Sequence, residues 1–201
     1  MGEATLQCSE FITDFDEKLP GLKHELPWLL VARAPALIVT LQASLGADYQ
    51  ITNGIAIHRT AQLETHVVLK GPLIIGPQCF VASHAYLRGG VWLVANNTVG
   101  PGCEVKSSVL FSHSKLAHFN FVGDSIIGAN CNFEAGAVIA NHYNERADKN
   151  ITVRWRDQPI ATGVQKFGAL VGDGCKVGAN AVLSPGTLLP PNTVVGRLQL
   201  V

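Results

Sequence analysis

The sequence has no excess of charge of either sign. Lysine and arginine together number 15, aspartate and glutamate together also number 15, and no block of like charge stands out. Proteins that bind nucleic acid or an anionic membrane surface through a general electrostatic field depend on such an excess. We therefore expect neither partner, and any charged ligand must be met by a few local side chains.

The sequence also lacks a long unbroken apolar run. The longest, from Trp28 to Leu45, is interrupted by Arg33 and Pro35 and is short for a membrane span. The N-terminus does not show the basic, apolar and small-residue order of a secretory signal. With 201 residues, of which 47% are apolar, the chain can build one continuous core. These features predict a soluble, cytoplasmic protein with no membrane partner.

The strongest feature that is present is a repeat of six residues. A period of six fits neither an α-helix nor simple strand alternation, but it suits short strands joined by tight turns around a three-sided coil of about 18 residues. The repeat slips near Val94 and is blurred from Phe111 to Ala117. Elsewhere apolar residues mark it at Ile57, Leu63, Leu69, Ile75, Val81, Leu87, Val99, Val105, Val122, Ile127, Phe133, Ile139, Val171, Val177, Leu183, Leu189 and Val195.

Four of the five cysteines occupy the fifth position of their hexapeptides, namely Cys79, Cys103, Cys131 and Cys175. Such a regular placement in the repeat favours small core residues over metal ligands or disulfide partners. Thiols used in this way fit a reducing compartment.

Two segments depart from the repeat. Residues 142–168 contain alternating apolar positions at Ile151, Val153 and Trp155 and a polar break, which predicts a two-stranded hairpin projecting from the coil. This hairpin could carry a binding loop, or it could cover the coil edge or contact a neighbouring subunit. Residues 1–50 show apolar positions at helical spacing and a second apolar segment broken at Pro35. We interpret them as a helical N-terminal cap over the open end of a coil formed by residues 51–201, with a membrane-surface role as the alternative.

Polar residues 18 apart should lie one above the other on a face of the coil. Arg88 and Lys106 form such a pair, at repeat positions where glycine or alanine is more usual. Two stacked cations repel each other unless an anion lies beside them, so we interpret them as a phosphate or pyrophosphate clamp, with solvated side chains as the alternative. His66 and His84 are also 18 apart, at outward positions typical of surface histidines.

His118 opens the segment HFNFVGDSIIGANCNFEAGAVIAN, residues 118–141, where the repeat is blurred. With an unperturbed pKa near 6.5, a histidine can accept a proton from an ammonium or hydroxyl nucleophile at neutral pH. The residues alone leave a structural role for His118 equally open.

This segment resembles the hexapeptide-repeat transferases, and within them the acetyltransferase half of N-acetylglucosamine-1-phosphate uridylyltransferase and the C-terminal domains of archaeal sugar-1-phosphate nucleotidylyltransferases. The resemblance covers roughly residues 55–196. It implies an all-β fold, a left-handed parallel β-helix, that usually assembles as a homotrimer. The relatives carry a nucleotidylyltransferase domain before the β-helix, and no Gly-rich, Arg-containing loop for a nucleoside triphosphate occurs among the first 50 residues here, so nucleotidyl transfer is not expected.

The resemblance also implies a function and a site. It implies an acyltransferase that uses acetyl-CoA as co-substrate, with no metal, to N-acetylate a phosphorylated amino sugar or a nucleotide-linked amino sugar. The implied catalytic residues are His118, the base, with Asn132 and Asn141. The implied acceptor site comprises Arg88, Lys106 and Phe121, which stands where the family has tyrosine, and the implied acetyl-CoA site comprises Lys149, Lys166 and Ala179.

Two other functions compete with this one. His84, His113 and His118 are arranged similarly to the three zinc ligands of the γ-class carbonic anhydrases, which are also hexapeptide β-helices. Alternatively, the chain is a non-catalytic β-helix that binds a sugar nucleotide or mediates assembly, because Phe121 and Ala147 replace a tyrosine and a lysine of the transferase pattern.

Overall fold

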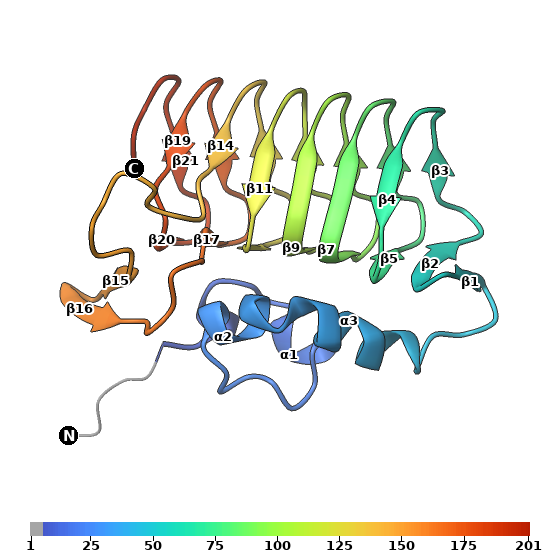
Figure 1. Ribbon diagram of the computed structural model, residues 1–201, viewed down its shortest axis with the longest axis horizontal. Coiled ribbons are helices and arrows are strands. Elements are labelled where there is room, and N and C mark those ends of the chain that lie inside the picture. The colour runs from blue at the N-terminus through green and yellow to red at the C-terminus, as the bar shows by residue number, and fades with distance from the viewer. Residues whose placement is uncertain (1–5) are drawn as a thin grey trace.

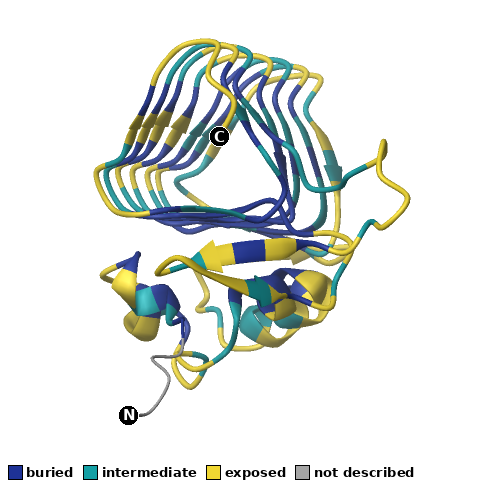
Figure 2. Cartoon of the chain, turned by 90° about the vertical axis from the view of Figure 1, so that its left-hand side faces the viewer, coloured by how far each residue is buried: buried dark blue, intermediate teal, exposed yellow. Residues whose placement is uncertain are grey.

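The structure, a computed structural model, describes residues 6–201. A left-handed parallel β-helix of triangular cross-section makes up its main body, and a layer of helices and a hairpin lies along one side (Figures 1 and 2). The predicted all-β fold is therefore confirmed.

The strands of the β-helix form three faces. Face 1 contains β2 (Ile55–His58), β5 (Leu73–Ile75), the second halves of β7 (Tyr86–Leu93) and β9 (Glu104–Leu110), β12 (Ile126–Ile127), β17 (Ala169–Val171) and β20 (Thr187–Leu189). Face 2 contains β4 (Val68–Lys70), the first halves of β7 and β9, β11 (Phe121–Gly123), β14 (Val138–Ile139) and β19 (Val182–Leu183). Face 3 is the seven-stranded sheet of β3 (Gln62–Leu63), β6 (Phe80–Val81), β8 (Thr98–Val99), β10 (Lys115–Leu116), β13 (Asn132–Phe133), β18 (Lys176–Val177) and β21 (Val194–Val195).

The inward side chains of the three faces make one continuous apolar core. The residues that mark the repeat are buried in it from Ile75 onward, together with all four repeat cysteines. Every cysteine of the chain is free and buried, so the prediction that the repeat cysteines are core residues is confirmed. At the N-terminal end of the β-helix the core is only partly covered, at Ile55, Ile57 and Leu69.

The repeat is not blurred between Phe111 and Ala117, contrary to the sequence interpretation. Leu110 and Leu116 continue the buried row. The number of residues per coil falls from 18 to 17 at the corner between faces 2 and 1. There Val91 pairs with Ser108, and Val109 pairs with Ile126, each 17 residues on. Single residues with positive φ, Ser107 (48°) and Asp124 (48°), turn this corner, whereas the coil before them uses Gly89 and Gly90.

The helices lie along face 1 of the β-helix, whereas the sequence led us to expect them over its open end. They are the 3-10 helix η1 (Cys8–Glu10), α1 (Phe15–Lys18), α2 (Pro27–Ala32) and α3 (Ala34–Gln42). Helix α3 packs against β5, β7 and β9, and α2 against β9 (Figure 1). Outward apolar side chains of face 1, such as Ile74 and Val109, are buried beneath this layer and provide the reason for its position. Within the described residues, no helix has the length and apolar character to cross a bilayer.

The predicted hairpin is present, formed by β15 (Thr152–Trp155) and antiparallel β16 (Gln158–Ala161). It leaves the coil but is held against the N-terminal segment. The ring centroids of Phe11 and Trp155 are 5.2 Å apart, and Arg156 forms a 2.8 Å ion pair with Glu10. The hairpin and the helices therefore form one layer over face 1, with a second apolar core between them that includes Phe15, Trp28 and Phe167.

Candidate active site

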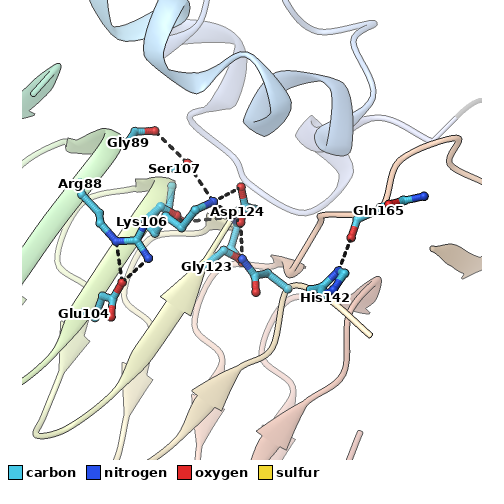
Figure 3. Close-up of polar contacts among 12 residues, drawn as sticks. Arg88, Gly89, Glu104, Lys106, Ser107, Gly123, Asp124, His142 and Gln165 are labelled. Carbon is cyan, nitrogen blue, oxygen red and sulfur yellow. Dashed lines mark hydrogen bonds and ion pairs between the residues drawn. The ribbon is translucent and has the colours of Figure 1, made fainter. Parts of the chain in front are cut away.

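Arg88 and Lys106 are neighbours in the strand register of face 2, as their 18-residue spacing predicts. Each is paired with a carboxylate of the same chain. Arg88 lies 2.7 Å from Glu104, and the Lys106 ammonium lies 2.8 and 2.7 Å from the two oxygens of Asp124 (Figure 3). The anion needed to hold two stacked cations together is therefore supplied in part by the protein itself.

Asp124 joins Lys106 to Asn141. The Asn141 amide donates a hydrogen bond to one Asp124 oxygen while Lys106 donates to both. Asp124 is only 7% exposed in its side chain and Lys106 17%, so this network is largely shielded from water. A β-carbon at Gly123 would lie 2.7 Å from the Asn141 amide nitrogen and 2.9 Å from the Phe121 ring. Glycine is thus required there to leave room for the side chains of Asn141 and Phe121.

A cleft of about 500 Å³ opens beside this network, between the β-helix and the helical layer. Lys106, Ser107 and Asp124 line it from the corner of the β-helix, and Gln165 and Lys166 line it from the segment after the hairpin. Residues of the helical layer close it, namely Val31, Ala32 and Pro35. The cleft thus places Lys166, predicted from the resemblance to contact acetyl-CoA, next to Lys106, predicted to contact the acceptor.

His118 lies before the N-terminal end of strand β11, whereas Asp124 follows its C-terminal end. His118 is exposed in the turn between β10 and β11, where its carbonyl accepts a 2.8 Å hydrogen bond from the Gly136 amide. Strand β11 spans about 10 Å at 3.3 Å per residue, and it separates His118 from the corner occupied by Asp124 and Asn141. One chain therefore gathers Arg88, Lys106, Phe121 and Asn141 but leaves His118 at the other edge of face 2.

The remaining predicted residues lie elsewhere. Asn132 is exposed on face 3, paired in register with Lys115. Ala179 lies in the turn two coils after that of His118, and its amide donates a 2.9 Å hydrogen bond to Glu134. Glu134 also pairs with Arg197 at 2.9 Å, which lowers the pKa of its carboxyl. Lys149 is half-buried in the loop before the hairpin and does not line the cleft.

The three histidines of the zinc alternative do not converge within the chain. His113 lies in the turn before β10, whereas His118 lies in the turn after it. His84 stacks instead on His66, with ring centroids 5.5 Å apart and planes 7° apart, as their spacing predicts. Among residues 6–201, no three His, Cys, Asp or Glu side chains are grouped closely enough to hold a metal ion.

Sequence reasoning missed the carboxylates that complete this site. Asp124 follows Lys106 by 18 residues and lies within reach of the same spacing rule. Glu104 follows Arg88 by only 16 residues and is in register with Tyr86, so that rule does not find it. The rule also applies to Lys70, which precedes Arg88 by 18 residues and is its neighbour in register.

Comparison with known proteins matches most of the β-helix to one family and to longer proteins. A family model described as the GMPPB C-terminal domain matches residues 69–197. Bifunctional protein GlmU of Methanococcus maripaludis is 38% identical over 117 residues, which cover 58% of this chain and 28% of that protein. A bifunctional sugar-1-phosphate nucleotidylyltransferase/acetyltransferase of Sulfurisphaera tokodaii is 33% identical over 98% of this chain and 53% of its own length. The chain thus spans about a quarter to a half of these relatives, and the resemblance stated from the sequence is confirmed.

Proposed function

Since the chain belongs to the GMPPB C-terminal domain family, we propose that it is an acetyl-CoA-dependent N-acyltransferase that acts on a phosphorylated amino sugar. The single observation that carries the proposal is a row on face 2 in which Arg88 lies next to Lys106 and Lys106 next to Gly123. Phe121 and Asn141 lie beside Gly123, and an exposed histidine, His118, lies at the other end of strand β11. The names of the relatives, which include acetyltransferase and sugar-1-phosphate activities, support the same reaction class.

The chemistry requires a base, an oriented amine and a thioester. A ring nitrogen of His118 takes a proton from the acceptor amine, and the nitrogen lone pair attacks the thioester carbonyl carbon. The amide bond forms, the carbon–sulfur bond breaks, and the thiolate of coenzyme A leaves. The proton taken from the amine stays on the imidazolium of His118. The exposed position of His118 leaves its ring nitrogens free for this transfer, because none of the side-chain hydrogen bonds among the described residues involves that ring.

The acceptor phosphate would be bound by the clamp of Arg88 and Lys106. Both cations already have carboxylate partners, so the phosphate must share Arg88 with Glu104 and Lys106 with Asp124. A charge-assisted hydrogen bond from each cation remains available because each nitrogen head carries several N–H donors. Phe121 would contribute an apolar contact to the sugar where the family has a tyrosine hydroxyl.

A neighbouring copy of the chain would complete the site. His118 and Asn141 are separated by strand β11, and Asn132 lies on face 3, so a complete set of catalytic residues requires faces 2 and 3 of different copies to meet. This requirement supports the homotrimer implied by the family. Acetyl-CoA would lie along the turns that contain His118 and Ala179, with Lys149 and Lys166 available for its phosphates.

The test is acetyl-CoA-dependent release of thiol by the purified protein, with glucosamine-1-phosphate, galactosamine-1-phosphate and nucleotide-linked amino sugars as acceptors. We expect turnover that falls by about 10²- to 10⁴-fold in His118→Ala, the usual contribution of a general base. His84→Ala is the matched control, because His84, like His118, is exposed in a turn between faces 3 and 2. Its rate should not change.

Two outcomes would contradict the proposal. Stoichiometric zinc in the purified protein that is lost in His113→Ala would favour the carbonic-anhydrase-like alternative. Acceptor binding that survives His118→Ala, in a protein with no turnover on any acceptor, would identify a non-catalytic module.

A further inference from the structure

The cationic column on face 2 extends one coil beyond the predicted clamp. Lys70 pairs in register with Arg88, and Arg88 pairs in register with Lys106. Three cations therefore lie on three consecutive coils at the strand spacing of about 4.8 Å. A clamp for a single phosphate needs only two of them.

The charge of this column is not evenly compensated. Asp124 and Glu104 neutralise Lys106 and Arg88, respectively. No carboxylate of residues 6–201 lies within ion-pair distance of Lys70, which is exposed. The uncompensated positive charge is therefore at the Lys70 end of the column, away from the cleft beside the helical layer.

An aromatic ring lies close to both cations at this end. The Lys70 ammonium is 5.1 Å from the centroid of the Tyr86 ring, and the Arg88 guanidinium carbon is 5.5 Å from it. Tyr86 is half-buried, and its neighbour in register, Val68, is 48% exposed. An anion bound by Lys70 and Arg88 would thus lie beside a small apolar and aromatic surface.

We propose that the acceptor is a nucleoside-diphosphate-linked amino sugar, an inference that rests on the proposed function and selects one acceptor class from it. Arg88 and Lys106 bind the phosphate attached to the sugar, and Lys70 with Arg88 binds the second phosphate one coil away. The nucleoside lies over Tyr86 and Val68, where a planar base can pack on the ring. The sugar points in the opposite direction, toward Gly123 and Asn141.

Binding measured without turnover tests this assignment. Titration calorimetry with inorganic phosphate, pyrophosphate and UDP should show tighter binding of the two diphosphates. Lys70→Ala should weaken pyrophosphate and UDP about tenfold, the effect of one charge-assisted hydrogen bond, and should leave phosphate within about twofold. Lys23→Ala, the same truncation of an exposed lysine in the helical segment, is the control and should change nothing.

The two proposals fail separately. Equal weakening of phosphate and pyrophosphate by Lys70→Ala, no weakening of either, or no binding of any of the three probes overturns the diphosphate assignment. If a sugar monophosphate is acetylated equally well by the native protein and by Lys70→Ala, the transferase stands and the diphosphate acceptor falls. If UDP binding depends on Lys70 but no acceptor is acetylated, the anion site stands and the transferase falls.

Discussion

Replacing Asp124 with asparagine removes one negative charge from the shielded network beside the cleft and changes the shape of the side chain very little. In the native protein, the Asp124 carboxylate accepts hydrogen bonds from the Lys106 ammonium at 2.8 and 2.7 Å and from the Asn141 amide. Asparagine offers one acceptor oxygen and no charge. The ammonium of Lys106, whose side chain is 17% exposed, then has no counter-ion within the network.

The expected loss of unfolding free energy depends on how deeply Lys106 and Asp124 are buried. Removing one partner of a fully buried ion pair costs about 3–5 kcal/mol. Lys106 lines the cleft and can turn its ammonium toward water, so we expect about 2 kcal/mol for Asp124→Asn. For a chain of 201 residues this corresponds to a decrease in Tm of about 4–8 °C. Lys106→Met should cost about 3 kcal/mol, because Asp124 is only 7% exposed and cannot turn to water in the same way.

Urea unfolding of the native protein, the two single variants and the double variant gives the coupling between the two side chains. The double variant should lose about 1–3 kcal/mol less than the sum of the single losses, because removing both charges leaves neither one uncompensated. Additivity within about 0.5 kcal/mol would refute the pair as a coupled, shielded unit and would mean that Lys106 is free to bind ligands without competition from Asp124.

Two further predictions concern the coil and its turns. Gly100→Ala places a β-carbon 1.7 Å from a backbone carbonyl oxygen of the next coil and should lower the free energy of unfolding by about 3 kcal/mol. Gly46→Ala, whose β-carbon would have no atom within 4 Å, is the control and should leave Tm unchanged in thermal melts. Equal Tm values for both variants would contradict the close stacking of the coils. Arg197 lowers the pKa of Glu134 below its ordinary value of 4.5, so the stabilisation from this pair is complete above the unfolded-state pKa and is lost as the pH falls through the lowered one. Glu134→Gln should therefore lower Tm slightly at pH 7 and not at pH 2, and a Tm difference that persists at pH 2 would contradict the pair.

The β-helix could be predicted from the sequence because its inward positions follow one simple rule. Each coil places small and apolar residues at fixed intervals, and Val81, Val99 and Cys103 are buried where the rule places them. The rule seemed to fail after Phe111 only because the corners at Ser107 and Asp124 are one residue shorter than the corner at Gly89 and Gly90. A shortened corner changes the phase of the repeat but not the burial of the residues that follow.

The position of the helical layer was not predicted, although the sequence carries a signal for it. Strands of face 1 have apolar residues on both sides, as at Ile74, Trp92 and Ile126, whereas outward positions of face 3 are more often polar, as at Gln62, Lys115 and Lys176. A strand that is apolar on both sides is covered on both sides. Every third hexapeptide belongs to the same face, so comparing the outward residues of one face at a time would have predicted that the helices cover face 1.

The candidate site was found only in part because spacing identifies neighbours but not their partners. The 18-residue interval correctly paired Arg88 with Lys106. It could not show that Asp124 holds both Lys106 and Asn141, since that contact depends on a side chain turning the corner of the coil. Nor could it show that His118 lies near one end of strand β11 and Asn141 near the other.

The layer over face 1 limits how copies of the chain can associate. With the helices and the hairpin on that face, two β-helices can meet side by side only across faces 2 and 3 (Figure 2). In any closed ring built from these contacts, the helical layer forms the outer rim, and the turn that carries His118 and the 72% exposed Phe119 faces the junction between neighbours. In such a ring, the N-terminal segment would determine which side of each copy faces outward.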